Sequence, residues 1–342
     1  MSADQITGLY AYFNQELARY DKKNPKEFNW GGELNNQSDG IVGVKLLLDP
    51  HQKRPHYLSS KASIKNEIKG LPKSPIQVTA DFIGAMHKHA MSEMSKKFSK
   101  GYVNLCRKEY VLSVPAVWSD AAKDATLKAA ELAGLNPVEL IKEPEAAALW
   151  TAKKMDRRLH RDDSFIVCDA GGGTVDLISY QVEAALPRLQ VKELVPGTGG
   201  MAGSLGLNKR FAEAVNDLVG DEQWLALKKS KAFFLAEKQF DREIKKSFHG
   251  GEDEEYFVNF PTAKLKDDLD KGLEASTWRM TGDDLKDIFD PLVDDIIRLI
   301  GDQGIFLVGG FGSNQYLTER VRNEHPDIDV LQPPDAWAAI AK

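Results

Sequence analysis

The stretch FIVCDAGGGTVDLISY, residues 165–180, decides the fold of this chain. An apolar run leads into three consecutive glycines, and Asp169 and Asp176 stand on either side of them. Glycine can adopt positive φ and leaves its backbone N–H bare, so a glycine turn at the end of a strand suits a phosphate group. The predicted phosphate turn consists of Gly171, Gly172, Gly173 and Thr174, whose hydroxyl adds one more donor.

The two flanking aspartates predict a metal ion beside that phosphate. Triphosphates arrive with Mg²⁺, which keeps most of its waters and takes one or two protein carboxylates. Asp169 and Asp176 lie on strands that both point at the turn, so they can supply those carboxylates. The alternative interpretation is an ordinary glycine-rich hairpin turn that holds no ligand.

Composition limits the classes of protein and partner. The chain has 342 residues, and its 45 basic and 51 acidic side chains give a net charge of −6, so nucleic acid is not an expected partner. Its 42% hydrophobic content and its length predict a globular protein of about two domains. No run of about 18 apolar residues occurs, so no contact with a membrane is expected. The two cysteines, Cys106 and Cys168, fit small core residues, and the cytoplasm is the expected location.

Strands and helices alternate along most of the chain. The segment EYVLSVPAVW predicts a strand, after which Ser119 caps a helix that Gly134 closes. Thr79 and Thr281 are the expected caps of two further helices, and Pro291 predicts a kink in the second of these. The segments VDLISYQVE and RLQVKELVPG predict a pair of antiparallel strands after the glycine turn.

Two more glycine turns repeat the pattern of the first. IFLVGGFGSN is a buried strand that ends at Gly309 and Gly310 and is followed by a helix, so a ribose and a base can lie against its bare turn. GTGG, residues 197–200, is the third such turn. Close packing of a strand against a helix is the alternative reason for these glycines.

Four motifs in a fixed order resemble one protein family between about residues 79 and 340. DAGGGTVD resembles the second phosphate motif of the seventy-kilodalton heat-shock chaperones, which belong to the actin and sugar-kinase superfamily. The segment from VPAVWSD to EPEAAAL resembles the connecting segment of that family, IFLVGGFGSNQYL its adenosine motif, and FDPLVDDI the helix before that motif. The sequences of the segments WSD, GGMAGSLGLNKRF and VKLLLDP are similar to those of the divergent, fungal-type chaperone-like ATPases.

The resemblance implies an α/β protein with the actin-like ATPase fold of two lobes, each a mixed sheet with helices. The first lobe would cover residues 1–162 and be incomplete, with an outer subdomain at about 28–103. The second lobe would cover residues 163–342, with an outer subdomain at about 198–281. ATP or ADP with Mg²⁺ would bind between the lobes, since closing two lobes can assemble a phosphate clamp.

The resemblance also implies a role for each site residue. Glu143, Asp169 and Asp176 would be catalytic, with Asp169 and Asp176 beside the metal. Lys245, Lys246 and Ser247 would sandwich the adenine, although a solvated charged helix face is the alternative. The complete nucleotide-binding set would be Gly171, Gly172, Gly173, Thr174, Gly199, Gly200, Lys245, Lys246, Ser247, Gly309 and Gly310.

The chain departs from the family pattern at both ends. Residues 1–45 lack the first phosphate motif, which would read as a strand followed by Asp, a small residue, Gly, Thr and Thr. Lys45 is the candidate for the catalytic lysine of the first lobe. The chain stops at PPDAWAAIAK, where the family continues, so a chain truncated at both ends or a degenerate relative is expected.

These features predict an ATP-binding, chaperone-like protein with weak or lost ATP hydrolysis. Its partners would be nucleotide and client or co-chaperone proteins. Two alternatives stay open: a non-catalytic interaction protein that keeps the fold without nucleotide, and a small-molecule kinase of the same superfamily. The missing first phosphate loop favours the interaction protein over the kinase.

Overall fold

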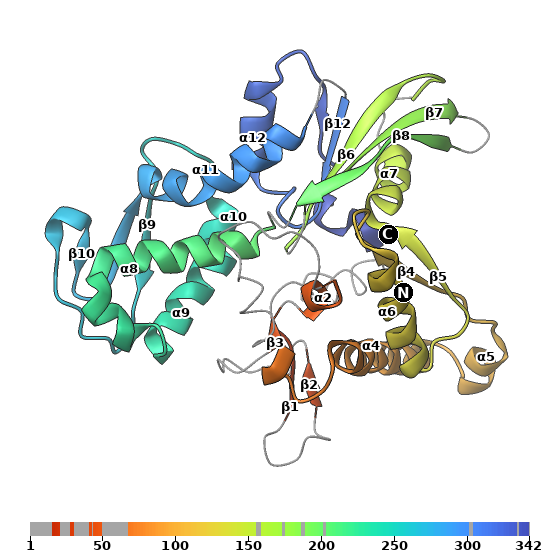
Figure 1. The fold of residues 1–342 in the computed structure, drawn as a ribbon, viewed down its shortest axis with the longest axis horizontal. Helices are drawn as coiled ribbons and strands as arrows, with labels where there is room; N and C mark the ends of the chain where they lie inside the picture. The colour runs from red at the N-terminus through yellow and green to blue at the C-terminus, as the bar shows by residue number, and fades with distance from the viewer. Residues whose placement is uncertain are drawn as a thin grey trace.

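The chain folds as a mixed α/β protein, in which the described strands form four separate sheets (Figure 1). This computed structural model describes residues 16–20, 28–30, 41–42, 44–49, 68–154, 159–172, 175–185, 189–200, 203–300, 304–333 and 335–341. The α/β class expected from the sequence is confirmed, and the several sheets with their helices are consistent with an actin-like ATPase fold. Among the described residues, no helix combines the length and the apolar character needed to cross a lipid bilayer.

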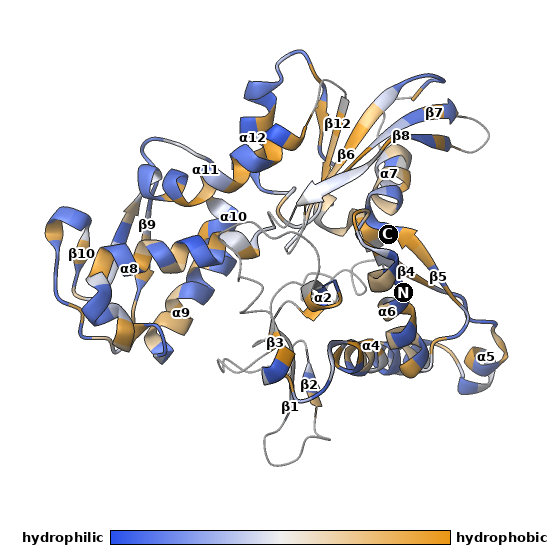
Figure 2. Ribbon diagram, viewed as in Figure 1, coloured by the Kyte–Doolittle hydropathy of each residue, from blue (hydrophilic) through white to orange (hydrophobic). Residues whose placement is uncertain are grey.

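A five-stranded sheet of order β13-β12-β6-β7-β8 is the largest of the described sheets. Its strands are β6 (Ser164–Ala170), β7 (Val175–Ala184), β8 (Gln190–Gly200), β12 (Gly304–Val308) and β13 (Val330–Leu331). The central strand β6 pairs in parallel with β12 and antiparallel with β7. β6 is covered on both faces, which explains its unbroken apolar run. Figure 2 shows β6 and β12 in hydrophobic colours.

Successive side chains of β6 point to opposite faces of this sheet, and helices pack against both faces. Ile166 and Cys168 face a core that contains residues of α8 (Leu205–Leu227), α11 (Gly282–Leu299) and α12 (Gln315–Glu324). Phe165 and Val167 face a second core, which includes Ala147 of α7 (Glu143–Lys154) and a residue of the 3₁₀ segment η5 (Ala336–Ala341). The sheet is therefore the middle layer of three.

A two-stranded parallel sheet lies nearer the N-terminus of the chain (Figure 1). It pairs β4 (Tyr110–Val114) with β5 (Val138–Lys142) through the crossover helix α6 (Asp120–Leu132). The Ser119 hydroxyl accepts the N–H of Ala122, and Gly134 ends the helix with φ +82°, so both predicted ends are confirmed.

The predicted cap at Thr79 is wrong. Helix α4 begins one turn earlier and runs Pro75–Lys97, with Ser74 as its cap. Ser74 accepts the N–H of Gln77, and the Gln77 side chain accepts the N–H of Ser74, which is a capping box with proline in the first turn. Thr79 is buried inside the helix instead.

The remaining elements fill two regions outside these sheets (Figure 1). The first holds β1 (Glu16–Tyr20), β2 (Phe28–Trp30), β3 (Ile41–Val42) and the short helix α2 (Val44–Leu47), and α5 (Lys100–Leu105) follows α4. The second follows α8 and holds α9 (Lys231–Gln239), a π-helical turn (Phe240–Ile244), α10 (Lys245–Ser247), a 3₁₀ turn (Leu269–Lys271), β9 (Glu255–Asn259), β10 (Leu273–Glu274) and β11 (Thr277–Thr281).

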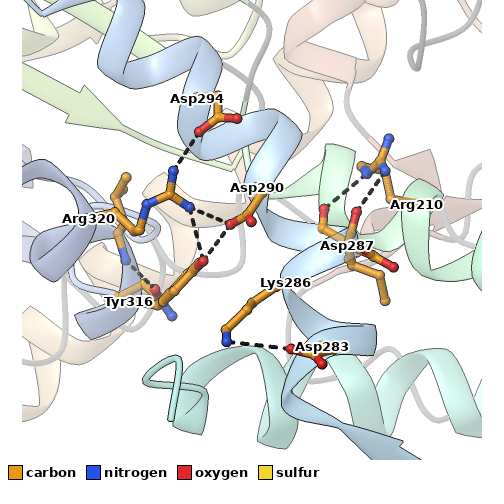
Figure 3. A network of polar contacts seen from close by, with 11 residues as sticks. Arg210, Asp283, Lys286, Asp287, Asp290, Asp294, Tyr316 and Arg320 are labelled. Carbon is orange, nitrogen blue, oxygen red and sulfur yellow. Dashed lines mark hydrogen bonds and ion pairs between the residues drawn. The ribbon is translucent and has the colours of Figure 1, made fainter. Parts of the chain in front are cut away.

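Helix α11 returns the chain from this second region to the five-stranded sheet. It starts with the predicted cap, since Thr281 and Asp284 form a capping box. Pro291 lies inside the helix and has no N–H for the carbonyl of Asp287. Arg210 of α8 donates instead, from Nη2 to the Asp287 carbonyl at 2.8 Å and from Nε to the Ile288 carbonyl at 3.0 Å (Figure 3).

A polar network joins α11 to α12 on the same side of the sheet (Figure 3). Arg320 of α12 donates to Asp290 at 2.5 Å and to Asp294 at 2.6 Å, and the Tyr316 hydroxyl donates to Asp290. Burial and the neighbouring Asp290 raise the pKa of Tyr316 to about 12, so its hydroxyl stays a donor at neutral pH. The Tyr316 ring also packs against Phe248, 4.8 Å between centroids.

Candidate functional site

One row of residues crosses four strands of the five-stranded sheet. Val308 of β12 lies opposite Asp169 of β6, Asp169 lies opposite Asp176 of β7, and Asp176 lies opposite Gly199 of β8. Gly309 follows Val308 directly, and the glycines after Ala170 leave β6 at the same level. The strand register therefore brings the three glycine turns of the sequence to one end of one sheet.

An acidic cluster with one lysine lies at this end of the sheet. Asp169 is 3% exposed, Asp176 is fully buried, and Glu143 is 3% exposed as the first residue of α7. The Lys45 ammonium reaches Glu143 from α2 and donates to its Oε1 at 2.6 Å. The charges of Asp169 and Asp176 also act on Lys45, so residues far apart in the sequence share one electrostatic site.

Burial and mutual repulsion control the charges in this cluster. The pKa of Asp169 lies well above its usual range, chiefly because of burial and then because of the neighbouring Glu143 and Asp176 carboxylates. Burial alone would lower the pKa of Lys45, but the Glu143 carboxylate raises it above its ordinary value. Lys45 is therefore a cation at neutral pH, and burial together with the neighbouring carboxylates disfavours the charged form of Asp169.

The Asp169 carboxylate has unused bonding capacity. Its Oδ1 is buried and has no hydrogen-bond partner among the described residues. Such an oxygen costs free energy unless it finds a donor or a cation. The described residues contain no group of three or more His, Cys, Asp or Glu placed to cage a metal ion. A cation here would therefore take one or two protein oxygens and complete its shell with other ligands, as Mg²⁺ does.

Gly309 is glycine for a steric reason. Its φ is +89°, and a Cβ there would lie 2.3 Å from Asp169 Oδ1 and 2.5 Å from the Ala170 carbonyl oxygen. Gly199 is equally constrained, since a Cβ would lie 2.3 Å from the Val175 carbonyl oxygen. Gly310 is different, because a Cβ there would meet no atom within 4 Å. Packing thus explains two of these glycines and leaves Gly310 facing open space.

Gly171 and Gly172 are not among the described glycines with positive φ. Hydrogen bonds fix this turn instead: the carbonyl of Gly171 accepts the N–H of Ser204 at 3.1 Å, and that of Gly172 accepts the N–H of Leu205 at 2.8 Å. Gly173 and Thr174 lie outside the described residues. Gly200 lies at the end of β8, opposite Val175.

The three residues expected around adenine differ in exposure. The Lys245 ammonium points into the protein, where it donates to Asp241 and Asn208, whereas Lys246 and Ser247 are exposed. The Ser247 hydroxyl donates to the carbonyl of Glu243 in its own helical segment. A contact between these side chains and adenine stays a prediction.

Several residues of this site carry no recognisable sequence signal. The backbone N–H of Val117, in the loop after β4, donates to Asp176 Oδ1 at 3.4 Å, and a Cβ at Gly199 would lie 3.2 Å from Val117 Cγ1. Asn208 and Asp241 surround Lys245 but belong to no motif. Asn314 could have been found, because an asparagine between a glycine turn and a helix is a typical cap.

Comparison with known proteins supports the family resemblance indicated by the sequence motifs. Residues 55–192 match the family model of the Hsp70 protein, and residues 160–303 match a domain of unknown function, DUF8340. Heat shock 70 kDa protein 12A of Mus musculus is 25% identical over 359 residues, which cover 78% of this chain and 52% of that relative. The chaperone protein HscA homolog of Laribacter hongkongensis is 37% identical over 172 residues, which cover 47% of this chain and 26% of that relative.

The chain is similar to divergent members of the Hsp70 family. A heat shock 70 kDa protein of Emericella nidulans is also 34% identical over 128 residues, 37% of this chain and 18% of the relative. The Hsp70-like chain spans about half the length of the curated 12A relatives that it matches. The family resemblance found from the four motifs is confirmed.

The residues of the Hsp70-like chain fit a Mg²⁺-bound phosphate group. Asp169 offers a buried oxygen without a partner among the described residues, and carboxylates are the ligands that Mg²⁺ prefers. Lys45 could supply positive charge for phosphate oxygens, and the bare turn at Gly310 leaves open space. Asp169 and Asp176 are the residues that could hold the metal.

Proposed function

We propose that this Hsp70-like chain binds ATP and ADP with Mg²⁺ at the end of its five-stranded sheet. The observation that carries the proposal is the cluster of buried Glu143, Asp169 and Asp176 with half-buried Lys45, at the level of three glycine turns. Asp169 has a raised pKa and a buried oxygen without a hydrogen-bond partner among the described residues, so its charged form costs free energy. A bound cation would reduce that free-energy cost. The relatives carry heat-shock and chaperone names, which supports the same proposal.

Each residue of the cluster has a proposed role. Lys45 neutralises charge on the phosphates, and its ion pair with Glu143 holds that carboxylate in place near the attacking water. Asp169 and Asp176 hold the metal and its water shell. Bound Mg²⁺ would neutralise charge that develops on the phosphate oxygens. Gly171, Gly172, Gly173 and Thr174 wrap the phosphates, and Gly199, Gly200, Gly309 and Gly310 line the nucleoside.

We propose a division into lobes at residues 1–162 and 163–342, with client or co-chaperone proteins as partners and the cytoplasm as the location. The free thiols of Cys106 and Cys168 support a reducing compartment. Clients and co-chaperones are proposed from the chaperone names of the relatives alone.

Calorimetric titration with Mg²⁺-ATP tests the proposed binding. Gly310→Val adds bulk where no protein atom lies within 4 Å, so we expect the variant to fold like the wild type. We expect its affinity for ATP to fall at least tenfold, because the side chain fills the space of the nucleoside. Gly101→Val on α5 is the matched control, since a Cβ there also meets no atom within 4 Å. A wild type that binds no ATP, or a folded Gly310→Val that binds ATP normally, would contradict the proposal.

We propose that these 342 residues hydrolyse ATP slowly or not at all. Residues 1–45 lack the Asp, Gly and paired Thr of a first phosphate loop, so fewer donors face the developing charge. Loss of one such donor in other enzymes costs about 3 kcal/mol, roughly a hundredfold in rate. A phosphate-release assay measures this directly. Turnover comparable to that of a complete chaperone ATPase, abolished by Asp169→Ala, would show that another segment replaces the loop.

A further inference from the structure

Lys245 lies where the start of α8 meets the π-helical turn. Its ammonium donates to Asp241 of the π-helical turn, to Asn208 Oδ1 of α8 at 2.9 Å, and to the carbonyl of Ser204 at 3.3 Å. The Lys245 side chain is only 11% exposed, and that of Asp241 is 6% exposed. An ammonium group has three N–H donors, and these three acceptors account for all of them. Lys245 therefore has no donor left for a nucleotide.

The partners of Lys245 lead to both glycine turns. On one side, Ser204 and the next residue donate their N–H groups to the carbonyls of Gly171 and Gly172 at 3.1 and 2.8 Å. On the other side, Asn314 Nδ2 donates to the Lys245 carbonyl at 3.0 Å. Asn314 caps α12, and its backbone N–H donates at 2.9 Å to Phe311, which follows the Gly309–Gly310 turn.

We propose that Lys245 is a positioning residue that fixes the distance between the phosphate turn and the adenosine turn. Its ammonium binds the Ser204 carbonyl, and its main-chain carbonyl accepts from Asn314, so it acts through these two residues rather than through contact with the base. The inference rests on the proposed nucleotide function. It assigns Lys245 a role in holding ligands that span both turns, such as ATP, and none for ligands that need the phosphate turn alone.

The burial of Lys245 supports this role. Burial lowers its pKa, and the Asp241 carboxylate opposes that shift. A buried cation is retained only where its partners are well placed, and removal of one partner leaves the other charge uncompensated. The neighbouring Lys246 is exposed and makes no such set of bonds among the described contacts, so it provides a matched comparison one residue away.

Titration of two ligands against two variants tests the proposal. The ligands are Mg²⁺-ATP, which spans both turns, and Mg²⁺-tripolyphosphate, which has no nucleoside. For Lys245→Met we expect a loss of at least tenfold in affinity for ATP and less than a threefold change for tripolyphosphate. For Lys246→Met we expect less than a threefold change for either ligand. A general loss of structure would weaken both ligands together.

A second variant keeps the test valid if Lys245→Met fails to fold. Asp241→Asn combined with Lys245→Met removes both charges, so no unpaired charge stays buried. An unchanged ATP affinity in the folded variant, an equal loss for both ligands, or a larger loss in Lys246→Met would each overturn the inference. A wild type that binds neither ligand would instead overturn the proposed nucleotide function, so the two failures are distinguishable.

Discussion

Asp169 shows how a single residue links the fold to the proposed function. Asp169 lies near the C-terminal end of the buried strand β6, and the strand register puts Asp176 directly opposite it. Burial then raises its pKa, with Glu143 and Asp176 adding to the shift. The folded protein therefore holds a proton on this carboxyl at pH values where the unfolded chain, with an aspartate pKa of about 3.9, has released it.

This difference predicts a pH effect on stability. Between about pH 4 and the raised folded pKa the native state binds more protons than the unfolded state, so the stability of the metal-free protein falls as pH rises. Asp169→Asn removes that contribution, and we expect its stability relative to the wild type to increase from pH 5 to pH 8. Urea unfolding without Mg²⁺ at the two pH values measures the difference, and the contributions of groups distant from Asp169 cancel. A difference that stays constant or shrinks with pH would contradict the assignment.

Among the secondary-structure elements, helix α11 accommodates an internal proline. Pro291 cannot bond the Asp287 carbonyl, and Arg210 from α8 supplies donors to that carbonyl and to the one after it (Figure 3). The guanidinium thus replaces a missing backbone bond and also ties α8, which follows the phosphate turn, to α11.

Paired substitutions test this replacement. Arg210→Met keeps the aliphatic stem and removes the donors, so we expect a loss of about 1 kcal/mol in the free energy of unfolding. In a Pro291→Ala background the alanine N–H can bond the Asp287 carbonyl, and we expect Arg210→Met to cost less there. Arg298→Met, which breaks an exposed pair with Asp295 and a bond to the Asp294 carbonyl within the same helix, is the control. Equal costs of Arg210→Met in both backgrounds would refute the explanation.

Local signals made much of the fold predictable from the sequence. The caps at Ser119 and Thr281 depend on residues within one turn, and the strand of residues 164–170 follows from an unbroken apolar run. The prediction of a cap at Thr79 is wrong because Ser74 and Gln77 form a capping box one turn earlier. The bonds of Arg210 and Lys245 could not be predicted, because they join segments that only the tertiary fold brings together.

At the scale of the whole molecule, contacts cross the proposed boundary between residues 162 and 163. Lys142 pairs with Glu193 of β8 at 2.5 Å, and Trp150 of α7 donates to Asp335 at 3.2 Å. The Val117 N–H adds a bond to Asp176 beside the acidic cluster. Residues on the two sides of this boundary are therefore already in contact without a ligand. Binding of a ligand that bridges them should slow the opening of backbone hydrogen bonds at the end of the five-stranded sheet.

Hydrogen–deuterium exchange of the wild-type protein with and without Mg²⁺-ATP tests the central claim most directly. The account predicts slower exchange, at saturating nucleotide, in peptides that cover residues 164–172, 197–200 and 304–312, since these carry the three glycine turns. Peptides from β9 to β11 serve as the internal control and should exchange at an unchanged rate. Binding of ATP with protection confined to other segments, or no protection anywhere at saturating concentration, would contradict a nucleotide site at this end of the sheet.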